Sequence, residues 1–600
     1  MSRELNCILG RKNASDTLPV HTSNVDLANK FKDYFIDKID NINENFPDSL
    51  GSYNYTAELP VKIFDKFSPI TDENVTELIS QMNKTHCQND PIDVRGLDFN
   101  KFPDIFSYYC DIINLSFQTG KFPEEEKFAY VRPLIKKGGD PDKLASYRPL
   151  YNTSFLSKLI EIAMLNQLIS HMDGFHNLPS FQSAYRNAHS VESALCRVYN
   201  DLVKTKANGD CSMLILLDLS SAFDTIDHIL LLDELELMGI RGSALNLIRS
   251  YLSNRGFCVT IENDVSEVGF MKSGVPQGTI MGPFLFIIYT ASLQYVLESL
   301  GVSYHLYADD TQIYFKITDK HADTDKLNQI SSTINEWMMS RKLKLNLGKT
   351  DIMIIGSEAK LTEFDFEAEL MFGESGVQRS TKLNNLGVIF DEHLLMKQQL
   401  NNSKKKAICA LINIAKISTF TNRIHRTQLV HSLVLSQLDY CNSLYYGIPN
   451  QDLNTMQMII NSAARIIVGM PRYSRERITP VCIDLHFLPI KARVEYKICL
   501  LAFKALFLDE PKYLADLLKP YATSSALELR SNGRLDEPFI TRAASISRCF
   551  EYCAPRLFNS LPQDVKGQVT INSFKKKLKT HLFSKSYNLS TLTTHTEYST

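Results

Sequence analysis

Hydrophobic periodicity divides the chain into helical and strand-like segments. Apolar residues recur at the spacing of an amphipathic helix over Asn24–Asn43, Ile105–Gly120 and Leu156–Met172. A further helix is expected to end near Lys206. The uninterrupted apolar run Met213–Leu217 that follows is typical of a buried central strand. These patterns predict a protein of mixed helix and sheet.

Polar and extended segments separate these elements. Loops rich in Asn, Asp, Ser and Pro surround the first helix up to about Pro91, and a short extended segment covers Tyr130–Lys137. The only tryptophan, Trp337, is spaced helically with Ile334 and Met338, so it is predicted to lie in a core.

Carboxylates stand where apolar strands end. Asp218 directly follows the apolar run, and Asp309 and Asp310 interrupt the stretch SYHLYADDTQIYF. Asp218 is either hydrogen-bonded into the next turn or placed for chemistry, and the Asp309–Asp310 pair is either a solvated turn or a metal-binding hairpin tip. If the strands are neighbours in one sheet, the three carboxylates converge at its rim, as two divalent metal ions require.

Length and composition restrict the class of protein. The chain has 600 residues, of which 44% are hydrophobic, so several packed subdomains are expected. No apolar run approaches the roughly 18 residues of a membrane span, and the charged opening MSRELNCILGRKN does not resemble a signal peptide. We therefore expect an intracellular protein of the nucleus or cytoplasm. The twelve cysteines contain no CxxC pair and are expected to be buried thiols.

The net charge of −2 conceals an uneven distribution. Residues 401–600 carry 27 Lys and Arg against 14 Asp and Glu, which leaves −15 for residues 1–400. The basic runs Ser403–Ala407 and Phe574–His581 suit contacts with phosphate groups, although a solvated surface is the alternative.

Seven ordered blocks between about Leu134 and Leu394 identify a family resemblance. They are LIKKGGDPDKLASYRPL, FQSAYRNAHSVESAL, LLDLSSAFDTIDH, SGVPQGTIMGPFLF, YADDTQIY, LKLNLGKTDIMIIG and LGVIFDEHL. In this order they closely resemble the reverse transcriptases of non-LTR (LINE-type, jockey-like) retrotransposons. SLVLSQLDYCNSLYYGIP, RITPVCIDLHFLPIKARVEYK and APRLFNSLP also resemble the region that follows the polymerase in this family. The resemblance implies an α+β right-hand polymerase with helical fingers, an antiparallel palm sheet and a helical C-terminal region.

The resemblance also implies a division into domains. We expect an N-terminal extension, a helical lead-in, a reverse transcriptase domain of fingers and palm, a helical thumb and a basic C-terminal region, over residues 1–85, 86–130, 131–390, 391–475 and 476–600. Family members usually carry an endonuclease before the polymerase, for which this chain has too little upstream sequence. We therefore expect a truncated copy or incomplete reading frame that needs a separate endonuclease for integration.

The function implied by the resemblance is RNA-directed DNA synthesis. The enzyme would extend a DNA primer on an RNA template with deoxynucleoside triphosphates, hold the RNA–DNA hybrid, and use two Mg²⁺ ions, with Mn²⁺ as a possible substitute. Asp218 and Asp309 would bridge the metal ions, Asp310 would assist, and the backbone carbonyl of Leu219 is a further candidate ligand.

Three basic residues are candidates for handling phosphate. By resemblance, Arg148 in SYRPL holds the triphosphate, because its guanidinium can bind two phosphate oxygens at once. Lys349 resembles the position proposed to give a proton to pyrophosphate, and a salt bridge to Asp351 is the alternative. Arg186, like Lys136, is equally well interpreted as a solvated cation.

Three further residues are candidates for contacting nucleotide or primer. Gln277 lies in a loop whose glycines permit a close backbone approach to template and incoming base. By resemblance, the bulk of Phe223 excludes the ribose 2′-hydroxyl, although it could instead pack in the palm core. Tyr307 packs beneath the primer end or is a plain strand residue.

The rival hypothesis is a catalytically inactive retroelement remnant that only binds RNA. The chain departs from the family at Ser292, near which an acidic residue is usual, and at Phe487, where a tryptophan is usual. Neither departure touches the three aspartates, so both bear on packing or RNA handling more than on chemistry.

Overall fold

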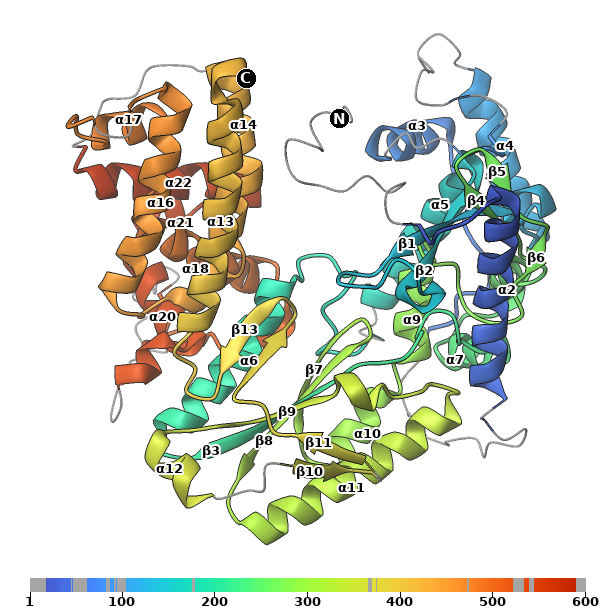
Figure 1. The fold of residues 1–600 in the computed structure, drawn as a ribbon, viewed down its shortest axis with the longest axis horizontal. Helices are drawn as coiled ribbons and strands as arrows, with labels where there is room; N and C mark the ends of the chain where they lie inside the picture. The colour runs from blue at the N-terminus through green and yellow to red at the C-terminus, as the bar shows by residue number, and fades with distance from the viewer. Residues whose placement is uncertain are drawn as a thin grey trace, which may run out of the picture. The chain divides into compact units, whose positions relative to one another are not determined.

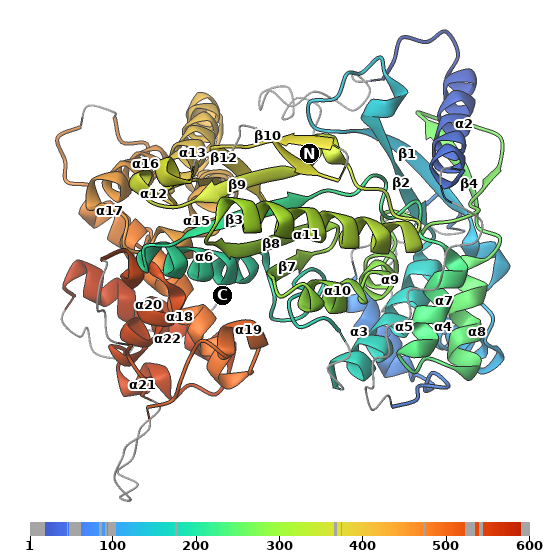
Figure 2. The same cartoon turned by 90° about the horizontal axis from the view of Figure 1, so that it is seen from below.

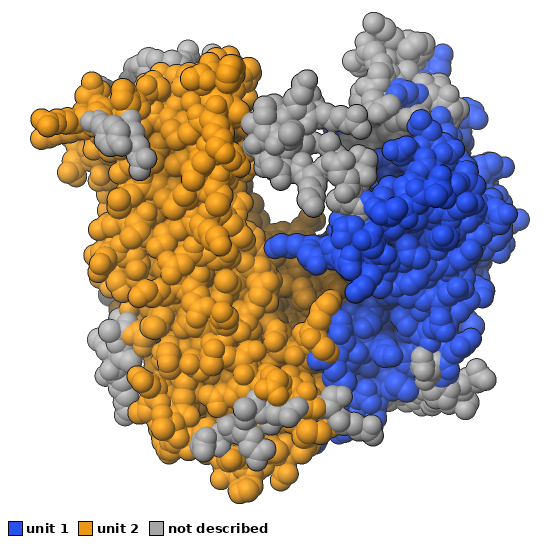
Figure 3. All heavy atoms as spheres, viewed as in Figure 1, with its two compact units in different colours: residues 1–185, 218–301, 329–347 blue, residues 186–217, 302–328, 348–600 orange. Residues whose placement is uncertain are grey.

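The computed structural model describes most of the chain, and Figures 1 and 2 show its elements from two directions. The described residues are 18–44, 46, 62–82, 87–90, 93, 104–174, 178–364, 369–373, 375–471, 474–521, 534–538 and 544–589. They fold into two compact units that interleave along the sequence (Figure 3). Unit 1 contains residues 1–185, 218–301 and 329–347, and unit 2 contains residues 186–217, 302–328 and 348–600.

Unit 1 is built mainly of helices. The helix that periodicity predicts at the N-terminal end is confirmed as α2 (Asn24–Asn43), which begins where Ser23 Oγ accepts a hydrogen bond from the backbone N–H of Asp26. The other helices of this unit are α3 (Asp72–Gln81), α4 (Asp104–Thr119), α5 (Phe155–Gly174), α7 (His228–Leu237), α8 (Gly242–Leu252), α9 (Gly282–Tyr289) and α10 (Leu293–Ser299). Helix α11 (Lys320–Ser340) begins in unit 2 and ends in unit 1.

A five-stranded sheet completes unit 1. Its strands are β1 (Ala129–Ile135), β2 (Tyr147–Thr153), β4 (Gly256–Ile261), β5 (Asp264–Val265) and β6 (Gly269–Phe270). The order is β2-β1-β4-β5 with β6 also on β4, and β1 runs antiparallel to β2 but parallel to β4. Apolar residues of α2, among them Phe31, pack on this sheet. The extended segment expected at Tyr130–Lys137 corresponds to β1, whose parallel partner β4 lies more than 100 residues away along the chain.

Unit 2 contains the strand predicted from the apolar run. This strand, β3 (Cys211–Leu217), is central in a sheet of order β7-β8-β3-β9, where β7 is Ser303–Tyr307, β8 is Asp310–Ile317 and β9 is Asp351–Ile355. All neighbours in this sheet are antiparallel, which confirms the predicted antiparallel sheet. Two hairpins follow, β10 (Glu369–Phe372) with β11 (Ser375–Gln378) and β12 (Lys382–Asn385) with β13 (Val388–Asp391).

Helices form the rest of unit 2 (Figure 1). They are α6 (Val191–Ala207), α12 (Glu358–Glu363), α13 (Lys397–Ile417), α14 (Arg423–Val430), α15 (Ser436–Asp439), α16 (Asn450–Val468), α17 (Thr479–Asp484), α18 (Ile490–Phe507), α19 (Lys512–Ala515), α20 (Phe550–Asn559), α21 (Gln563–Lys566) and α22 (Ile571–Tyr587). This agrees with the predicted α+β class and its helical C-terminal region. No helix within the described ranges has both the length and the apolar character needed to cross a membrane.

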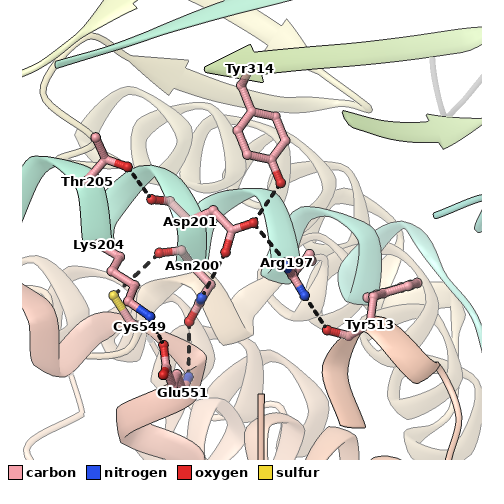
Figure 4. A network of polar contacts seen from close by, with 9 residues as sticks. All are labelled: Arg197, Asn200, Asp201, Lys204, Thr205, Tyr314, Tyr513, Cys549 and Glu551. Atoms are coloured by element: carbon pink, nitrogen blue, oxygen red, sulfur yellow. Dashed lines mark hydrogen bonds and ion pairs between the residues drawn. The ribbon is translucent and has the colours of Figure 1, made fainter. Parts of the chain in front are cut away.

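A polar network joins the C-terminal helices to α6 and β8 (Figure 4). The carboxylate of Asp201 accepts hydrogen bonds from Arg197 Nε at 2.9 Å and from Tyr314 Oη at 2.7 Å. Arg197 also donates to the backbone carbonyl of Tyr513 at 2.8 Å, and Lys204 pairs with Glu551 at 2.7 Å. Because these partners come from α19, α20 and β8, the C-terminal helices share one folded unit with the sheet.

Residues singled out for packing lie in cores. Trp337 is fully buried, as predicted, and its Nε1 donates to Ser292 Oγ at 3.1 Å. Arg341 donates to the same hydroxyl at 3.2 Å and pairs with the buried Glu234. Phe487 is also buried. Of the eleven free cysteines within the described ranges, all except Cys409 are buried, in agreement with the prediction of buried thiols.

Candidate active site

The hairpin of β7 and β8 in unit 2 carries two adjacent carboxylates. Tyr307, the last residue of β7, pairs with Asp310, the first of β8, so Ala308 and Asp309 alone form the connection. Ala308 has φ 55°, a left-handed conformation that is uncommon for a residue with a Cβ and that clusters at functional sites. The stretch SYHLYADDTQIYF therefore forms a β-hairpin, which is compatible with both a solvated turn and a metal-binding hairpin tip.

Pairing with β3 fixes the position of this hairpin in the sheet. Leu217, the last residue of β3, lies opposite Thr311, the residue after Asp310. Next to Thr311 on β8, the buried side chain of Gln312 accepts a hydrogen bond of 2.7 Å through Oε1 from Nδ2 of the buried Asn385. Tyr307 is half-buried, and burial raises the pKa of its hydroxyl. The carboxylates of Asp309 and Asp310 thus sit at the end of the sheet where β3 finishes.

In unit 1, Asp218 is held by Asn346. The carboxylate Oδ2 of Asp218 accepts a hydrogen bond from Asn346 Nδ2 at 3.0 Å, and its backbone carbonyl accepts from the Asn346 N–H at 2.9 Å. The pairing continues where Leu219 bridges Leu345 in antiparallel fashion. Asn346 orients the Asp218 carboxylate, and sequence reasoning did not single it out although it lies in the quoted block LKLNLGKTD.

The segment after Asp218 turns sharply and places Phe223 against another ring. Ser221 has φ 55°, and its carbonyl accepts a hydrogen bond from the N–H of Asp224 at 2.8 Å. The ring of Phe223 stacks on that of Phe286 at 4.7 Å between centroids and 25° between planes, and Phe223 remains partly exposed. This geometry is compatible with both interpretations of Phe223.

The loop that contains Gln277 packs closely on its own protein. Gly274 has φ +83°, and a Cβ added there would lie 2.5 Å from the carbonyl oxygen of Asp224, so only glycine fits. Gln277 Nε2 donates to Asp224 Oδ1 at 3.0 Å, and the carbonyl of Gln277 accepts from the Tyr151 N–H at 2.9 Å. Gly274 therefore serves the close approach of this loop to the Ser221–Asp224 turn.

The basic candidates occupy different parts of the fold. Arg148 is exposed on β2, opposite Leu134, and Lys349 is exposed two residues before the start of β9. Arg186 is half-buried in the loop before α6. The pKa of the nearby His189 is lowered to about 4, mainly by burial of His189 and to a lesser extent by the charge of Arg186. Arg148 belongs to unit 1, whereas Lys349 and Arg186 belong to unit 2.

The residues that are candidates for binding metal offer the type of ligand atom that Mg²⁺ prefers. The carboxylates of Asp218, Asp309 and Asp310 and the carbonyl of Leu219 offer only hard oxygen atoms. Within the described residues, no group of three or more His, Cys, Asp or Glu side chains is arranged closely enough to hold a metal ion. Asp309 and Asp310 provide two carboxylates on one hairpin, and Asp218 follows Leu217 by a single peptide bond.

Comparison with known proteins agrees with these features. Residues 135–390 match the family described as reverse transcriptase (RNA-dependent DNA polymerase). The chain is 26% identical to the RNA-directed DNA polymerase from mobile element jockey of Drosophila funebris, over 70% of this chain and 46% of that protein. It is 24% identical to the probable RNA-directed DNA polymerase from transposon BS of Drosophila melanogaster, over 74% and 49%. The chain thus spans about half the length of the curated relatives that it matches.

One solved structure shows a distant likeness. Apo telomerase from Candida tropicalis, truncated from the C-terminal domain, is 12% identical with a TM-score of 0.32, and the match covers 48% of this chain and 59% of that one. At this level the likeness carries no functional argument.

Proposed function

We propose that this chain, whose residues 135–390 match the reverse transcriptase family, is the RNA-directed DNA polymerase of a non-LTR retrotransposon. The observation that carries the proposal is the β7–β8 hairpin, which presents Asp309 and Asp310 beside the end of β3. Asp218 is the next residue after β3. Carboxylates at the ends of two paired strands are the arrangement that two-metal nucleotidyl transfer needs.

The three aspartates would hold two Mg²⁺ ions, with the carbonyl of Leu219 as a further ligand. When bound, these ions lower the pKa of the primer 3′-hydroxyl and neutralise charge on the departing pyrophosphate. Asn346 holds one carboxylate oxygen of Asp218 and so restricts the orientations that this ligand can adopt. Mn²⁺ has the same preference for oxygen ligands and would substitute for Mg²⁺.

The remaining candidates would handle nucleotide, primer and phosphate. Arg148 is exposed on β2 and can bind two phosphate oxygens, which suits the triphosphate of a deoxynucleotide. Lys349, also exposed, would protonate pyrophosphate, and Arg186 would contribute positive charge. Gln277 and Phe223 would contact the incoming nucleotide, and Tyr307 would pack beneath the primer end.

The substrates would be an RNA template and a DNA primer, held as a hybrid. Support comes from the excess of basic residues in the C-terminal third of the chain. Helix α22 carries exposed Lys576 and Lys579, which can neutralise phosphates. Because relatives of this kind are named as mobile-element polymerases, integration would also need a nick in DNA, for which a separate endonuclease is a candidate.

Primer extension with purified protein tests this proposal. The substrate is a poly(rA) template with an oligo(dT) primer, in Mg²⁺ or Mn²⁺, and Asp309→Asn is compared with Asp325→Asn, an exposed aspartate of α11. Asp309→Asn keeps the shape of the side chain and removes its charge, so extension should fall by orders of magnitude, roughly 10³-fold or more. Asp325→Asn should extend normally, and circular dichroism should show both variants folded.

Two results would contradict the proposal. Equal extension by the unchanged protein and by Asp309→Asn would exclude a metal role for this carboxylate. Tight RNA binding without extension in either metal would favour the inactive, RNA-binding remnant.

A further inference from the structure

Two segments of unit 1 are joined by hydrogen bonds around a buried carboxylate. The N–H of Gly274 donates to the carbonyl of Ile226 at 2.7 Å, and that of Val275 donates to the carbonyl of Phe223 at 2.9 Å. Asp224, between these two acceptors, is 9% exposed, and its Oδ1 accepts from Gln277 Nε2 at 3.0 Å. This acid is therefore buried at the junction of the turn after Asp218 and the loop of Gln277.

Among the described residues, burial of this acid is compensated only by one side-chain hydrogen bond and by the charges of Lys38 and Lys136. Within the described part of the chain, the Asp224 carboxylate accepts a hydrogen bond but forms no ion pair, and a buried carboxylate without one is costly. Its side chain touches the one residue of the loop that has a candidate role at the nucleotide. We propose that Asp224 is a positioning residue that fixes the side-chain amide of Gln277 in a single orientation, an inference that rests on the proposed polymerase function.

The chemistry of the two groups explains how such fixing would work. An amide has a donor end and an acceptor end of nearly equal size, so packing alone does not distinguish its two orientations. An ionised carboxylate only accepts hydrogen bonds, and it therefore selects the Nε2 end of Gln277. The amide oxygen Oε1 is then held on the side away from Asp224, where it is available as an acceptor.

The protonation state of Asp224 would control this selection. Burial raises the pKa of the Asp224 carboxyl to about 6, while the charges of Lys38 and Lys136 and the Gln277 hydrogen bond act in the opposite direction. Lys38 lies on α2, and Lys136 follows β1, where its Nζ donates to the carbonyl of Ala145 at 2.9 Å. A protonated carboxyl can donate as well as accept, so below about pH 6 both orientations of the amide become possible.

The raised pKa of Asp224 also indicates that its charge does not stabilise the fold, which distinguishes a positioning role from a structural one. Because the pKa in the folded protein lies above the ordinary value of 3.8, folding favours the protonated form. Stability contributed by this group is therefore present below pH 4 and lost as the pH rises to about 6. At pH 8 the ionised Asp224 lowers the stability of the fold, so removing its charge should not unfold the protein.

Steady-state kinetics of primer extension on poly(rA) test the inference with four variants. They are Asp224→Asn, Asp224→Ala, Gln277→Ala and the double variant Asp224→Ala/Gln277→Ala, with Asp233→Ala, on the exposed side of α7, as a control. At pH 8, Asp224→Ala should raise the KM for deoxynucleotide about 10-fold, and the double variant should be no worse than Gln277→Ala, because both residues act through one amide. The melting temperature of Asp224→Asn should equal or exceed that of the unchanged protein.

The pH profile supplies a second measurement. In the unchanged protein the KM should rise below about pH 6, as Asp224 takes up a proton, and this rise should be absent in Asp224→Asn. Additive effects of Asp224→Ala and Gln277→Ala on the KM would overturn the positioning role. A fall in kcat that is matched by a fall in melting temperature would do the same. Either result would leave the polymerase proposal unaffected. Absence of extension by the unchanged protein would overturn the polymerase proposal together with this inference.

Discussion

Asn346 holds Asp218 by two hydrogen bonds, one to the carboxylate at 3.0 Å and one to the backbone carbonyl at 2.9 Å. A single residue thus restrains both the side chain and the main chain of a proposed metal ligand. Groups that orient a ligand affect metal binding although they do not touch the metal.

The first prediction is that Asn346→Ala weakens the response of primer extension to Mg²⁺. Loss of the orienting amide should lower activity roughly 10-fold at low Mg²⁺, with partial recovery at saturating Mg²⁺, since such partners typically contribute 10- to 100-fold. A Mg²⁺ titration of initial rates measures the effect. Asn328→Ala, an exposed asparagine on α11, is the matched control. An unchanged Mg²⁺ midpoint in folded Asn346→Ala would mean that this hydrogen bond does not orient a metal ligand.

The contrast between Asp218 and Asn346 shows what the sequence could predict about the site. Asp218 follows an apolar run, and a charge at the end of a buried strand is conspicuous in one sequence. Asn346 and Asp224 act through contacts with residues 128 and 53 positions away. Nothing in their immediate neighbours signals such contacts, because an Asn or Asp beside a turn usually satisfies its own backbone.

The same distinction applies to the fold. The buried strand β3 and the helices α2, α4 and α5 follow from local periodicity. Their predicted first and last residues agree with the observed ones to within two residues. The sheet of unit 1 depends on the parallel pairing of β1 with β4, for which no short-range pattern exists. Burial on both faces also removes the alternation that would mark β4, since all of its six residues are buried.

The second prediction concerns stability in acid and His305. This residue of β7 is fully buried, and its ring lies edge-on to that of Tyr513 with 4.8 Å between centroids. Burial lowers the pKa of His305 to about 3, and the charges of Arg197 and His189 act in the same direction. The unfolded chain binds a proton near pH 6.5 and the folded chain does not, so this contribution to stability is present above pH 6.5 and lost as the pH falls toward 3.

Thermal unfolding between pH 7 and pH 5 measures this contribution. His305→Phe keeps a ring against Tyr513 and removes the titration, so its melting temperature should fall less with acidification than that of the unchanged protein. One such group changes the free energy of unfolding by at most about 1.4 kcal/mol per pH unit. His321→Phe, at an exposed position of α11, should leave the pH dependence unaltered. Parallel pH profiles for the unchanged protein and His305→Phe would refute the assignment.

The third prediction tests the basic surface of α22. Deleting the chain after Ser474 would be the simplest experiment, but Arg197 and Lys204 of α6 bond to Tyr513 and Glu551, so a deletion would also disturb the fold. Substitution of exposed Lys576 and Lys579 by Gln avoids this problem. RNA affinity should weaken, and the slope of its logarithm against log salt should fall by about 0.7 for each lost phosphate contact.

A charge-matched control separates specific contacts from net charge. Lys30 and Lys66 are exposed in unit 1, and substituting both by Gln removes the same charge far along the sequence from α22. Their slope should match that of the unchanged protein in fluorescence anisotropy with a labelled RNA. If the two double variants behave alike, the lysines of α22 are part of a solvated surface.

The last prediction concerns Phe223, whose ring stacks on Phe286 at 4.7 Å and 25°. If the ring excludes the ribose 2′-hydroxyl by its bulk, Phe223→Val should raise the efficiency of ribonucleotide relative to deoxynucleotide incorporation by at least about 10-fold. If the ring only packs, the same substitution should lower stability and both efficiencies together. The measurement is the ratio of kcat/KM for the two nucleotides with the same base.

A second stacked phenylalanine provides the control for packing alone. Phe507 stacks on Phe503 at 4.4 Å and 26°, nearly the geometry of Phe223 on Phe286, but at 52% it is more exposed than the half-buried Phe223. Phe507→Val should therefore cost no more free energy of unfolding than Phe223→Val, at most about 2 kcal/mol, without changing nucleotide choice. A shift in the ratio for Phe223→Val but not for Phe507→Val would establish that Phe223 contacts the sugar. An equal ratio in both variants, with both proteins folded, would assign Phe223 to the core and leave sugar selection to another residue.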